Sequence, residues 1–497
     1  MEATVGNSEP GDARPSRRAV VIGLLVLFVA AAVAINVYTF TSQTAGDRDP
    51  FIYAQVGKDV LAGKRLYSET WIDKPPLGLL MYAVPQLFVP RSYKAIVVFG
   101  AVILVAQGVL FACAFRRSLA AAAAAALFVM FYPLELGTFT WPSTEHFANL
   151  FVTGNLVIAL AITRARTFST MQCLAAGALA IAAFHVRQNT VLCGLLPVLA
   201  VCLSDRSWRE RWRAGCLMIA GGLIVWAMIV VAMAIVGDLP GYWWIMFVHP
   251  RIFASLGSAA ELLDLARYFA GTSLALFWVI FALLAAERRY LPLVAGSAFI
   301  GPVGCLLTFH DHPHYLVNAL PYVALLIGLG TQRLAKLGPG FPWFSVAAIG
   351  ISLLPSVSGR LRIVAAEPTY LPFVQIAAEV DRVAPENGTL WVCGPQPSEA
   401  IQFISRLPSA NVFCWIFQMR APWKELLPKP WDEIAKEYSQ HPPDVIVVHH
   451  GIEQQAHTAA GPVKEDEYLQ LLRALLVEQH YTRAAESEGY SILLRTN

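Results

Sequence analysis

The sequence predicts a polytopic α-helical membrane protein with a small C-terminal α/β domain outside the membrane. Of its 497 residues, 56% are hydrophobic and only 14% are charged, which is too apolar for a soluble protein. Apolar runs close to the length that crosses a bilayer recur from residue 19 to about residue 357. Clusters of arginine separate these runs. Their spacing predicts about eleven spans.

The longest apolar runs give the clearest spans. They are Ala19–Phe40, Ala95–Phe115, Ala214–Val236, Thr272–Ala286 and Tyr315–Thr331. The first run is too long for the core of a signal peptide, and no small-residue cleavage site separates it from the polar loop that follows. We therefore expect it to remain as a membrane helix.

The distribution of basic residues predicts the orientation of the chain. The arginine-rich short loops, for example 116–117, 206–213 and 288–289, belong in the cytoplasm by the positive-inside rule. The intervening polar loops, at 41–93, 134–147, 185–189, 237–267 and 309–314, then face outward, as does the C-terminal segment. The net charge of +3 is too small to indicate a nucleic-acid partner.

Composition divides the chain into three parts. Residues 1–16 are polar and predict a disordered cytoplasmic tail, 17–357 form the membrane domain, and 358–497 have the composition of a soluble domain. Within the membrane domain, Pro76–Val89 is apolar but short, which favours a helix at the membrane interface. Cys173–Leu203 is flanked by basic loops at both ends, so we expect two short halves with Arg187 at the outer turn.

In the C-terminal part, β-rich runs alternate with helical patterns. The runs Gly388–Cys393 and Asp444–His449 predict strands, and Phe373–Val383 and Glu465–Gln479 predict helices. The loop after the first strand lacks the GxGxxG spacing, so no nucleotide site is expected. Cys393 and Cys414 both fall in this part, either as a disulfide or as two free buried thiols.

The first outside loop carries the most informative polar residues. Asp47 and Asp49 precede Tyr53-Ala54, and Lys74-Pro75-Pro76-Leu77 follows some twenty residues later. Ionisable groups beside a bilayer are costly and are functional candidates. The alternative is that the aspartates are solvated loop acids, or that Asp49 is the N-cap of a helix over Ile52–Ala62.

This combination resembles the membrane-embedded (GT-C) glycosyltransferases that use dolichyl- or undecaprenyl-phosphate sugars. That group includes protein O-mannosyltransferases and the aminoarabinose transferases acting on lipid A. The matching residues are Asp49, Tyr53-Ala54 and Lys74-Pro75-Pro76-Leu77, with Gly63-Lys64-Arg65-Leu66-Tyr67 between them. The motif covers some thirty residues, and the likeness extends over the membrane domain as architecture.

The resemblance implies roles for these residues. Asp49 would be the general base that takes the proton of an acceptor hydroxyl, and Lys74 would contact the donor phosphate. Relatives often have Asp-Glu where this chain has Asp49-Pro50, which leaves Asp47 as a second possible base. The spacing to Tyr53 favours Asp49. A one-step displacement would invert the anomeric centre.

The resemblance also points to residues in later outside loops. Glu145 matches an acidic position, although Ser143 or Thr144 followed by Glu145 also predicts a helix N-terminus. Arg187 would hold phosphate, or it would form a structural pair with Glu145 or Glu135. His314 and Tyr315 match a third, phosphate-side position.

The last outside loop also permits a different interpretation. Residues 310–315 contain three histidines and an aspartate, a composition that suggests zinc. All ligands would come from six consecutive residues, a spacing unlike a helix-borne site. We therefore expect no metal and no cofactor.

These observations predict a multi-pass glycosyltransferase of a bacterial inner membrane, with its active site and C-terminal domain on the periplasmic side. Its partners would be a polyprenyl-phosphate-linked sugar donor, a lipid, glycan or protein acceptor, and the lipid bilayer, with no nucleic acid. The alternatives are a transporter or flippase of lipid-linked sugars, or an inactive membrane partner. A transporter would place its charges near the bilayer midplane, often in two related halves.

Overall fold

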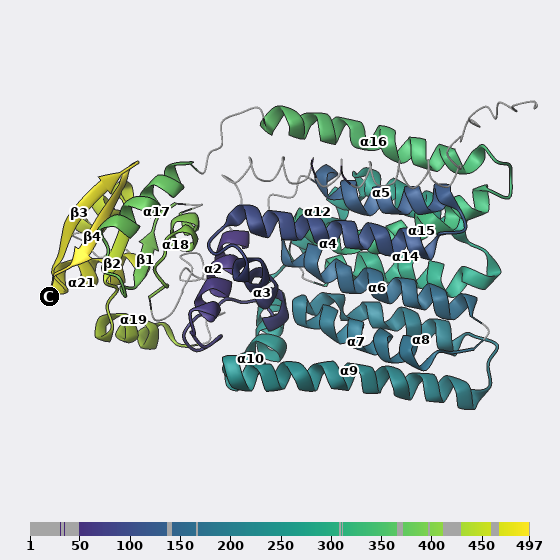
Figure 1. Ribbon diagram of the computed structural model, residues 1–497, viewed down its shortest axis with the longest axis horizontal. Helices are drawn as coiled ribbons and strands as arrows, with labels where there is room; N and C mark the ends of the chain where they lie inside the picture. The colour runs from purple at the N-terminus through teal and green to yellow at the C-terminus, as the bar shows by residue number, and fades with distance from the viewer. Residues whose placement is uncertain are drawn as a thin grey trace, which may run out of the picture.

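The computed structural model describes residues 30, 34, 49–136, 142–165, 167–307, 310, 312–364, 371–395, 398–410, 429–458 and 467–496. Over this part the protein consists of a bundle of long helices at one end and a small mixed sheet with its own helices at the other (Figure 1). Two short helices, α2 (Asp49–Leu61) and α3 (Pro76–Ala83), lie between these two parts.

The helix bundle is built from apolar segments that run side by side in Figure 1. The bundle helices are α4 (Tyr93–Ala114), α5 (Leu119–Glu135), α6 (Thr144–Arg164), α7 (Thr170–Val186), α8 (Leu195–Cys202), α9 (Trp208–Val236), α13 (Ser273–Ala285), α14 (Leu291–Leu306), α15 (Leu320–Leu334) and α16 (Phe341–Val364). The more polar α12 (Ala259–Ala270) precedes α13 and is bent by 71° from it. Shorter elements connect them on the side of the sheet: α10 (Leu239–Trp243), η3 (Trp244–Val248), α11 (His249–Leu256) and η5 (Pro313–Ala319).

Within the described residues, five helices are long and apolar enough to cross a membrane, and a sixth span results if the bent pair α12 and α13 counts as one. Shorter apolar helices accompany them, including α7, the combined η2 (Gln188–Gly194) and α8, and α3 with η1 (Pro76–Leu87). The chain is a multi-pass membrane protein. The predicted first span lies mostly outside the described residues, and the count of about eleven spans stays a prediction.

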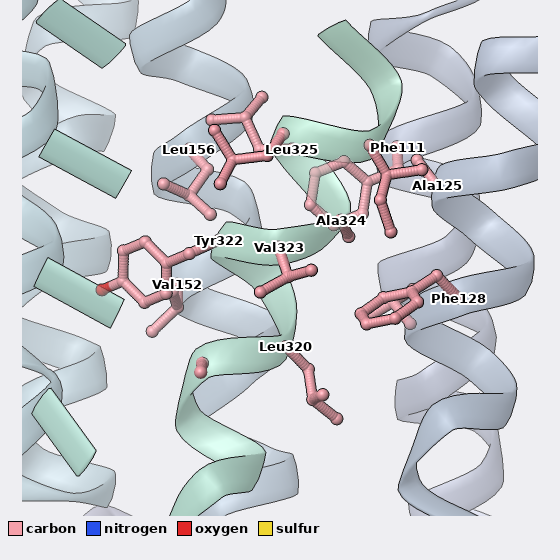
Figure 2. Packing of buried hydrophobic residues seen from close by; sticks show 14 of the residues in the cluster. Phe111, Ala125, Phe128, Val152, Leu156, Leu320, Tyr322, Val323, Ala324 and Leu325 are labelled. Carbon is pink, nitrogen blue, oxygen red and sulfur yellow. The ribbon is translucent and has the colours of Figure 1, made fainter. Parts of the chain in front are cut away.

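Helix α15 forms the centre of the bundle, because every residue from Leu320 to Thr331 is buried. Apolar side chains from α4, α5 and α6 surround it (Figure 2). Gly328 lies against the ring of Phe115, so closely that a Cβ at this position would overlap the ring. Because lipid tails are as apolar as leucine, this close packing is what holds the helices together.

The C-terminal α/β region, residues 371–496, contains a four-stranded sheet in the order β1-β2-β4-β3. The strands are β1 (Leu390–Cys393), β2 (Val445–His449), β3 (Tyr481–Ser487) and β4 (Tyr490–Arg495), and the helices are α17 (Leu371–Val383), α18 (Glu399–Ile404), α19 (Trp431–Gln440), α20 (His450–Thr458) and α21 (Glu467–Glu478). β1 and β2 are parallel, whereas β4 is antiparallel to both of its neighbours.

The structure confirms both predicted strands and both predicted helices of this region to within two residues. The sequence analysis missed the β3–β4 hairpin. Its two-residue turn, Glu488-Gly489, has positive φ values of 49° and 80°, as a type I′ turn requires. The domain boundaries at residues 16 and 357 stay predictions.

Candidate active site

The site begins with α2 (Asp49–Leu61), whose first turn carries Asp49. The helix starts three residues earlier than the predicted helix from Ile52, so Asp49 lies inside the first helical turn. The hydroxyl of Tyr53, one turn further on, donates a hydrogen bond of 2.9 Å to Asp49 Oδ2. Asp49 is half-buried and Tyr53 is almost fully buried. Asp47 lies outside the described residues.

Two glycines allow the elements of the site to approach one another. A Cβ at Gly57 of α2 would lie 2.9 Å from the backbone nitrogen of Ala83, at the end of α3 (Pro76–Ala83). A Cβ at Gly78 of α3 would lie 2.8 Å from the carbonyl oxygen of Val186, the last residue of α7. Backbone contacts this close leave no room for a side chain. The first contact holds α2 against the end of α3, and the second holds the start of α3 against the end of α7.

Lys74 lies just before α3, whose N-cap is Pro75. Its backbone carbonyl accepts a 2.7 Å hydrogen bond from the hydroxyl of Tyr67, which fixes the approach to the Pro-Pro corner. Its ammonium group is 3.3 Å from both carboxylate oxygens of Asp73 and 5.6 Å from the ring centre of Tyr53. Lys74 is therefore held over the tyrosine that binds Asp49.

Arg187 follows α7 in an extended conformation, at the predicted break between two short apolar halves. Its guanidinium group is 2.9 Å from Glu145 Oε1, and the two side chains are only 9% and 2% exposed. Arg187 also lies over the ring of Tyr315, 5.0 Å from its centre. The structural pairing considered from the sequence is thus present with Glu145. The side chain of Glu135 lies outside the described part.

Glu145 lies in the first turn of α6, where the sequence predicts a helix N-terminus. Ser143 is the N-cap, and its backbone and hydroxyl bond to the ring of His146. His146 therefore occupies the capping-box position at which a glutamate or glutamine is usual. Glu145 is left free to contact Arg187, and His314 lies 3.8 Å away from the same carboxylate.

A cavity of about 260 Å³ joins several of these groups. Its lining includes three of the predicted site residues, Lys74, Arg187 and Tyr315, together with Asp73 and His249. Asp49 and His314 are not among the lining residues. Each is linked to a lining residue through one intermediate residue, Asp49 through Tyr53 to Lys74 and His314 through Glu145 to Arg187. The structure thus brings Asp49, Lys74, Glu145, Arg187, His314 and Tyr315 into one network of contacts.

The charges around this cavity shape one another. Burial raises the pKa of Asp73, but the positive charge of Lys74 and its hydrogen bond to the carboxylate outweigh this effect and hold the pKa below its usual value. Burial, together with the charges of Asp49 and Asp73, raises the pKa of Tyr53 well above its usual value, so the phenol keeps its proton and acts as a donor. Burial lowers the pKa of His249 to about 4, so this ring is neutral at pH 7.

The sequence analysis missed four polar residues of the cavity. Asp73 was not predicted as a site residue although it adjoins Lys74. Gln188 and Asn189 were not predicted either, although they directly follow Arg187. His249 comes from α11, and its Nε2 lies 3.8 Å from Asp73 Oδ2. Position beside a motif residue was the available signal for the first three. No local signal pairs His249 with a residue far earlier in the chain.

The zinc and disulfide alternatives both involve residues outside the described part. Asp311 of the histidine-rich loop lies there, and among the described residues no group of three or more side chains could hold a metal ion. The ring of His310 bonds instead to Glu261 and to the carbonyl of Phe253. Cys414 also lies outside the described part, so its pairing with Cys393 stays a prediction.

The fold defines the class. The chain has the fold of the GT-C membrane glycosyltransferases, and its charged cavity is lined by residues between Asp73 and Tyr315. The structure of ArnT from Cupriavidus metallidurans bound to undecaprenyl phosphate is similar over 95% of this chain and 98% of that chain, with a TM-score of 0.58 and 14% identity. ArnT is an aminoarabinose transferase.

Two other glycosyltransferases share the fold. The oligosaccharyltransferase of Archaeoglobus fulgidus matches over 95% of this chain and 80% of that chain, with a TM-score of 0.56 and 10% identity. The mycobacterial arabinofuranosyltransferase AftD matches over 95% of this chain and 40% of that chain, with a TM-score of 0.50 and 16% identity. No family model and no curated protein matches the sequence. The likeness therefore lies in the fold.

Proposed function

We propose that this protein transfers a sugar from a polyprenyl-phosphate donor to an acceptor outside the cytoplasm. The observation that carries the proposal is the pair of cations, Lys74 and Arg187, which come from separate elements and line one cavity. A phosphate group is the ligand that such a pair recognises. On the same fold, ArnT is known bound to undecaprenyl phosphate.

In the proposed reaction, the acceptor hydroxyl attacks the anomeric carbon of the sugar. Its proton passes to the carboxylate of Asp49, and the bond between the anomeric carbon and the phosphate oxygen breaks. The polyprenyl phosphate leaves with the bonding electron pair, and the anomeric configuration inverts. Lys74 and Arg187 stabilise the charge that develops on the departing phosphate. Tyr53 orients the Asp49 carboxylate through its hydrogen bond.

His314 and Tyr315 have supporting roles in this proposal. Tyr315 presents its ring to the guanidinium group of Arg187 and so fixes the direction of the cation. His314 lies 3.8 Å from the same Glu145 oxygen that Arg187 contacts, where it helps hold that carboxylate. The proposed location is the inner membrane of a bacterium with the cavity on the periplasmic face. Lipid, glycan and protein acceptors all offer the hydroxyl that the reaction needs.

A transporter of lipid-linked sugars is the second candidate. In a transporter the ion pairs would lie near the bilayer midplane. In the described residues, the contacts of Asp49, Lys74, Glu145 and Arg187 gather at the end of the bundle next to the C-terminal α/β region. This position favours chemistry at one membrane face.

The test is transfer of labelled sugar from a polyprenyl-phosphate donor by purified protein. Asp49→Asn should reduce the turnover rate by about 100-fold or more, because proton acceptance typically contributes a factor of about 10² to 10⁴. The control is Asp432→Asn, which changes an exposed aspartate of α19 and should leave the rate unaltered. Equal rates for Asp49→Asn and wild type would remove Asp49 as the base. Movement of lipid without sugar transfer would favour the transporter.

A further inference from the structure

The last turn of α2 carries charges that a surface helix would leave in water. Lys58 instead points at the C-terminal α/β region, more than 340 residues later in the chain. Its ammonium group lies 2.7 Å from the carbonyl oxygen of Gln402, 2.9 Å from that of Ser405 and 2.8 Å from that of Leu407. These carbonyls belong to the end of α18 and the turn after it, where a helix has unsatisfied acceptors and partial negative charge.

The neighbouring Asp59 is fully buried and binds the same segment with the opposite polarity. It accepts hydrogen bonds from the backbone nitrogen of Ser409 at 3.2 Å and from the hydroxyl of Ser409. Within its own part of the chain it accepts from Gln55 at 2.9 Å and from Thr70 at 3.1 Å. All of these donors serve one carboxylate, so the buried charge is well compensated.

A third charge extends the contact to the sheet. Lys64 donates to the carbonyls of Ser409 and Ala410. The same short segment pairs with β1, because Leu390 donates to the carbonyl of Pro408 at 3.0 Å and Ala410 donates to that of Leu390 at 2.9 Å. We call Lys58, Asp59 and Lys64, together with segment 402–410, the interlock. It joins α2 to the framework of the C-terminal sheet.

Holding these charges out of water is costly. Burial lowers the pKa of Lys58 to about 7, although the facing carboxylates of Asp59 and Asp381 act in the other direction; Arg91 and Lys64 lower it further. Burial likewise lowers the pKa of Lys64. A contact between two parts of a chain does not require buried charges, because apolar packing would serve as well. What hydrogen-bonded charges add is a fixed register and direction.

That fixed direction matters because of what else α2 carries. Asp49 and Lys58 are nine residues apart on one helix, about 14 Å along its axis at 1.5 Å per residue. A rotation or shift of the helix at Lys58 therefore moves Asp49 as well. Lys74 and Arg187, in contrast, lie outside α2.

We propose that the C-terminal α/β region positions the Asp49 carboxylate by holding α2 through the interlock, and that Lys58, Asp59 and Lys64 are positioning residues for transfer. The proposal rests on the proposed function, since it takes Asp49 as the base. It assigns this region a part in the rate of the reaction, in place of a role as an independent appendage.

The experiment compares full-length Lys58→Met with wild type in the sugar-transfer assay and in hydrogen exchange. Lys58 is the best residue to change, because the hydrogen bonds of its ammonium group all cross to segment 402–410, whereas Asp59 also binds Thr70. We expect kcat to fall by about 10- to 100-fold, the loss typical of a displaced catalytic group, with donor KM within about twofold of wild type. Amide exchange should accelerate in 49–61 and 398–410 and stay unchanged in α15.

A milder variant and matched controls complete the design. Ser409→Ala removes one hydroxyl donor to Asp59 and should lower kcat in the same direction by a smaller factor. Lys94→Met and Ser439→Ala change an exposed lysine of α4 and an exposed serine of α19, and both should behave as wild type.

Three results would decide the matter. Unchanged kcat in Lys58→Met would overturn the proposal, and so would faster exchange throughout α15, because the interlock would then serve folding in general. If the wild type itself transfers no sugar, the proposed function fails and takes the catalytic part of this inference with it. The exchange data would still show separately whether the interlock holds α2.

Discussion

The ion pair between Arg187 and Glu145 offers the sharpest test of the site, because one arrangement supports two explanations. The pair is deeply buried, with 9% and 2% of the side chains exposed. Removing one partner of such a pair leaves the other charge uncompensated, at a typical cost of about 3–5 kcal/mol. Arg187→Met should therefore destabilise the protein by about that amount, reduced by the remaining contact of His314 with Glu145.

Adding Glu145→Gln to Arg187→Met removes the stranded charge. The double variant should recover most of the stability, as the buried site is then neutral. Binding of undecaprenyl phosphate should not recover. A lost charge-assisted hydrogen bond to the phosphate corresponds to about 1.5–3 kcal/mol, or about 10- to 100-fold weaker binding. Glu145→Gln alone should keep Arg187 available and bind the lipid at least as well as wild type.

The assays are thermal unfolding and titration with undecaprenyl phosphate, carried out on purified wild type, both single variants and the double variant. Arg289→Met, which changes an arginine at the opposite, exposed end of the bundle, is the control for loss of a positive charge. A double variant that recovers stability and lipid binding together would refute the reasoning. Arg187 would then be a structural partner of Glu145 and nothing more.

Two further predictions concern packing and pH. Gly78→Leu should separate α3 from the end of α7, because even a Cβ at this position would lie 2.8 Å from the carbonyl oxygen of Val186. The variant should weaken binding of undecaprenyl phosphate about tenfold or more. The control is Gly350→Leu in open space on α16, which should leave the binding unchanged. Burial lowers the folded-state pKa of His249 from 6.5 to about 4, so the unfolded chain binds more protons than the folded protein between these two pH values. The free energy of unfolding therefore falls by up to about 3 kcal/mol as the pH drops from 6.5 to 4. In thermal unfolding scans at pH 7 and pH 4.5, His249→Phe should lessen this loss of stability, whereas His441→Phe at an exposed position should not. An unaltered pH dependence in His249→Phe would contradict the lowered pKa of His249.

The sequence predicted those parts of the site that depend on local pattern. Asp49, Tyr53 and Lys74 lie within one loop that the sequence predicts to face outward, and their spacing to a Pro-Pro corner is visible without a structure. The break at Arg187 was predictable as well, because a lone arginine between two short apolar runs has to lie at a polar turn. The strands β1 and β2 stood out as short apolar runs, of which β2 is rich in valine and isoleucine.

What the sequence did not reveal depends on contacts between distant residues. The interlock pairs Lys58 and Asp59 with residues near 405, and nothing in a lysine and an aspartate at a helix end announces a buried partner. The approach of α3 to α7 depends on Gly78. Because glycine is also common in other membrane helices, its presence in the sequence does not indicate this contact. The number of spans stays a prediction, because the first expected span lies mostly outside the described residues.

The arrangement of charge around the cavity explains how one pair can be both structural and functional. Each proposed phosphate-binding cation already faces a carboxylate, Lys74 beside Asp73 and Arg187 beside Glu145. Two buried cations without these partners would be costly while no donor is bound. A donor phosphodiester carries one negative charge, whereas the released polyprenyl phosphate carries nearly two. In the proposed reaction, the cations would therefore interact more strongly with the departing group, as its charge develops, than with the bound donor, and this difference lowers the barrier. Asp73 and Glu145 would compete with the product for the cations and so allow its release.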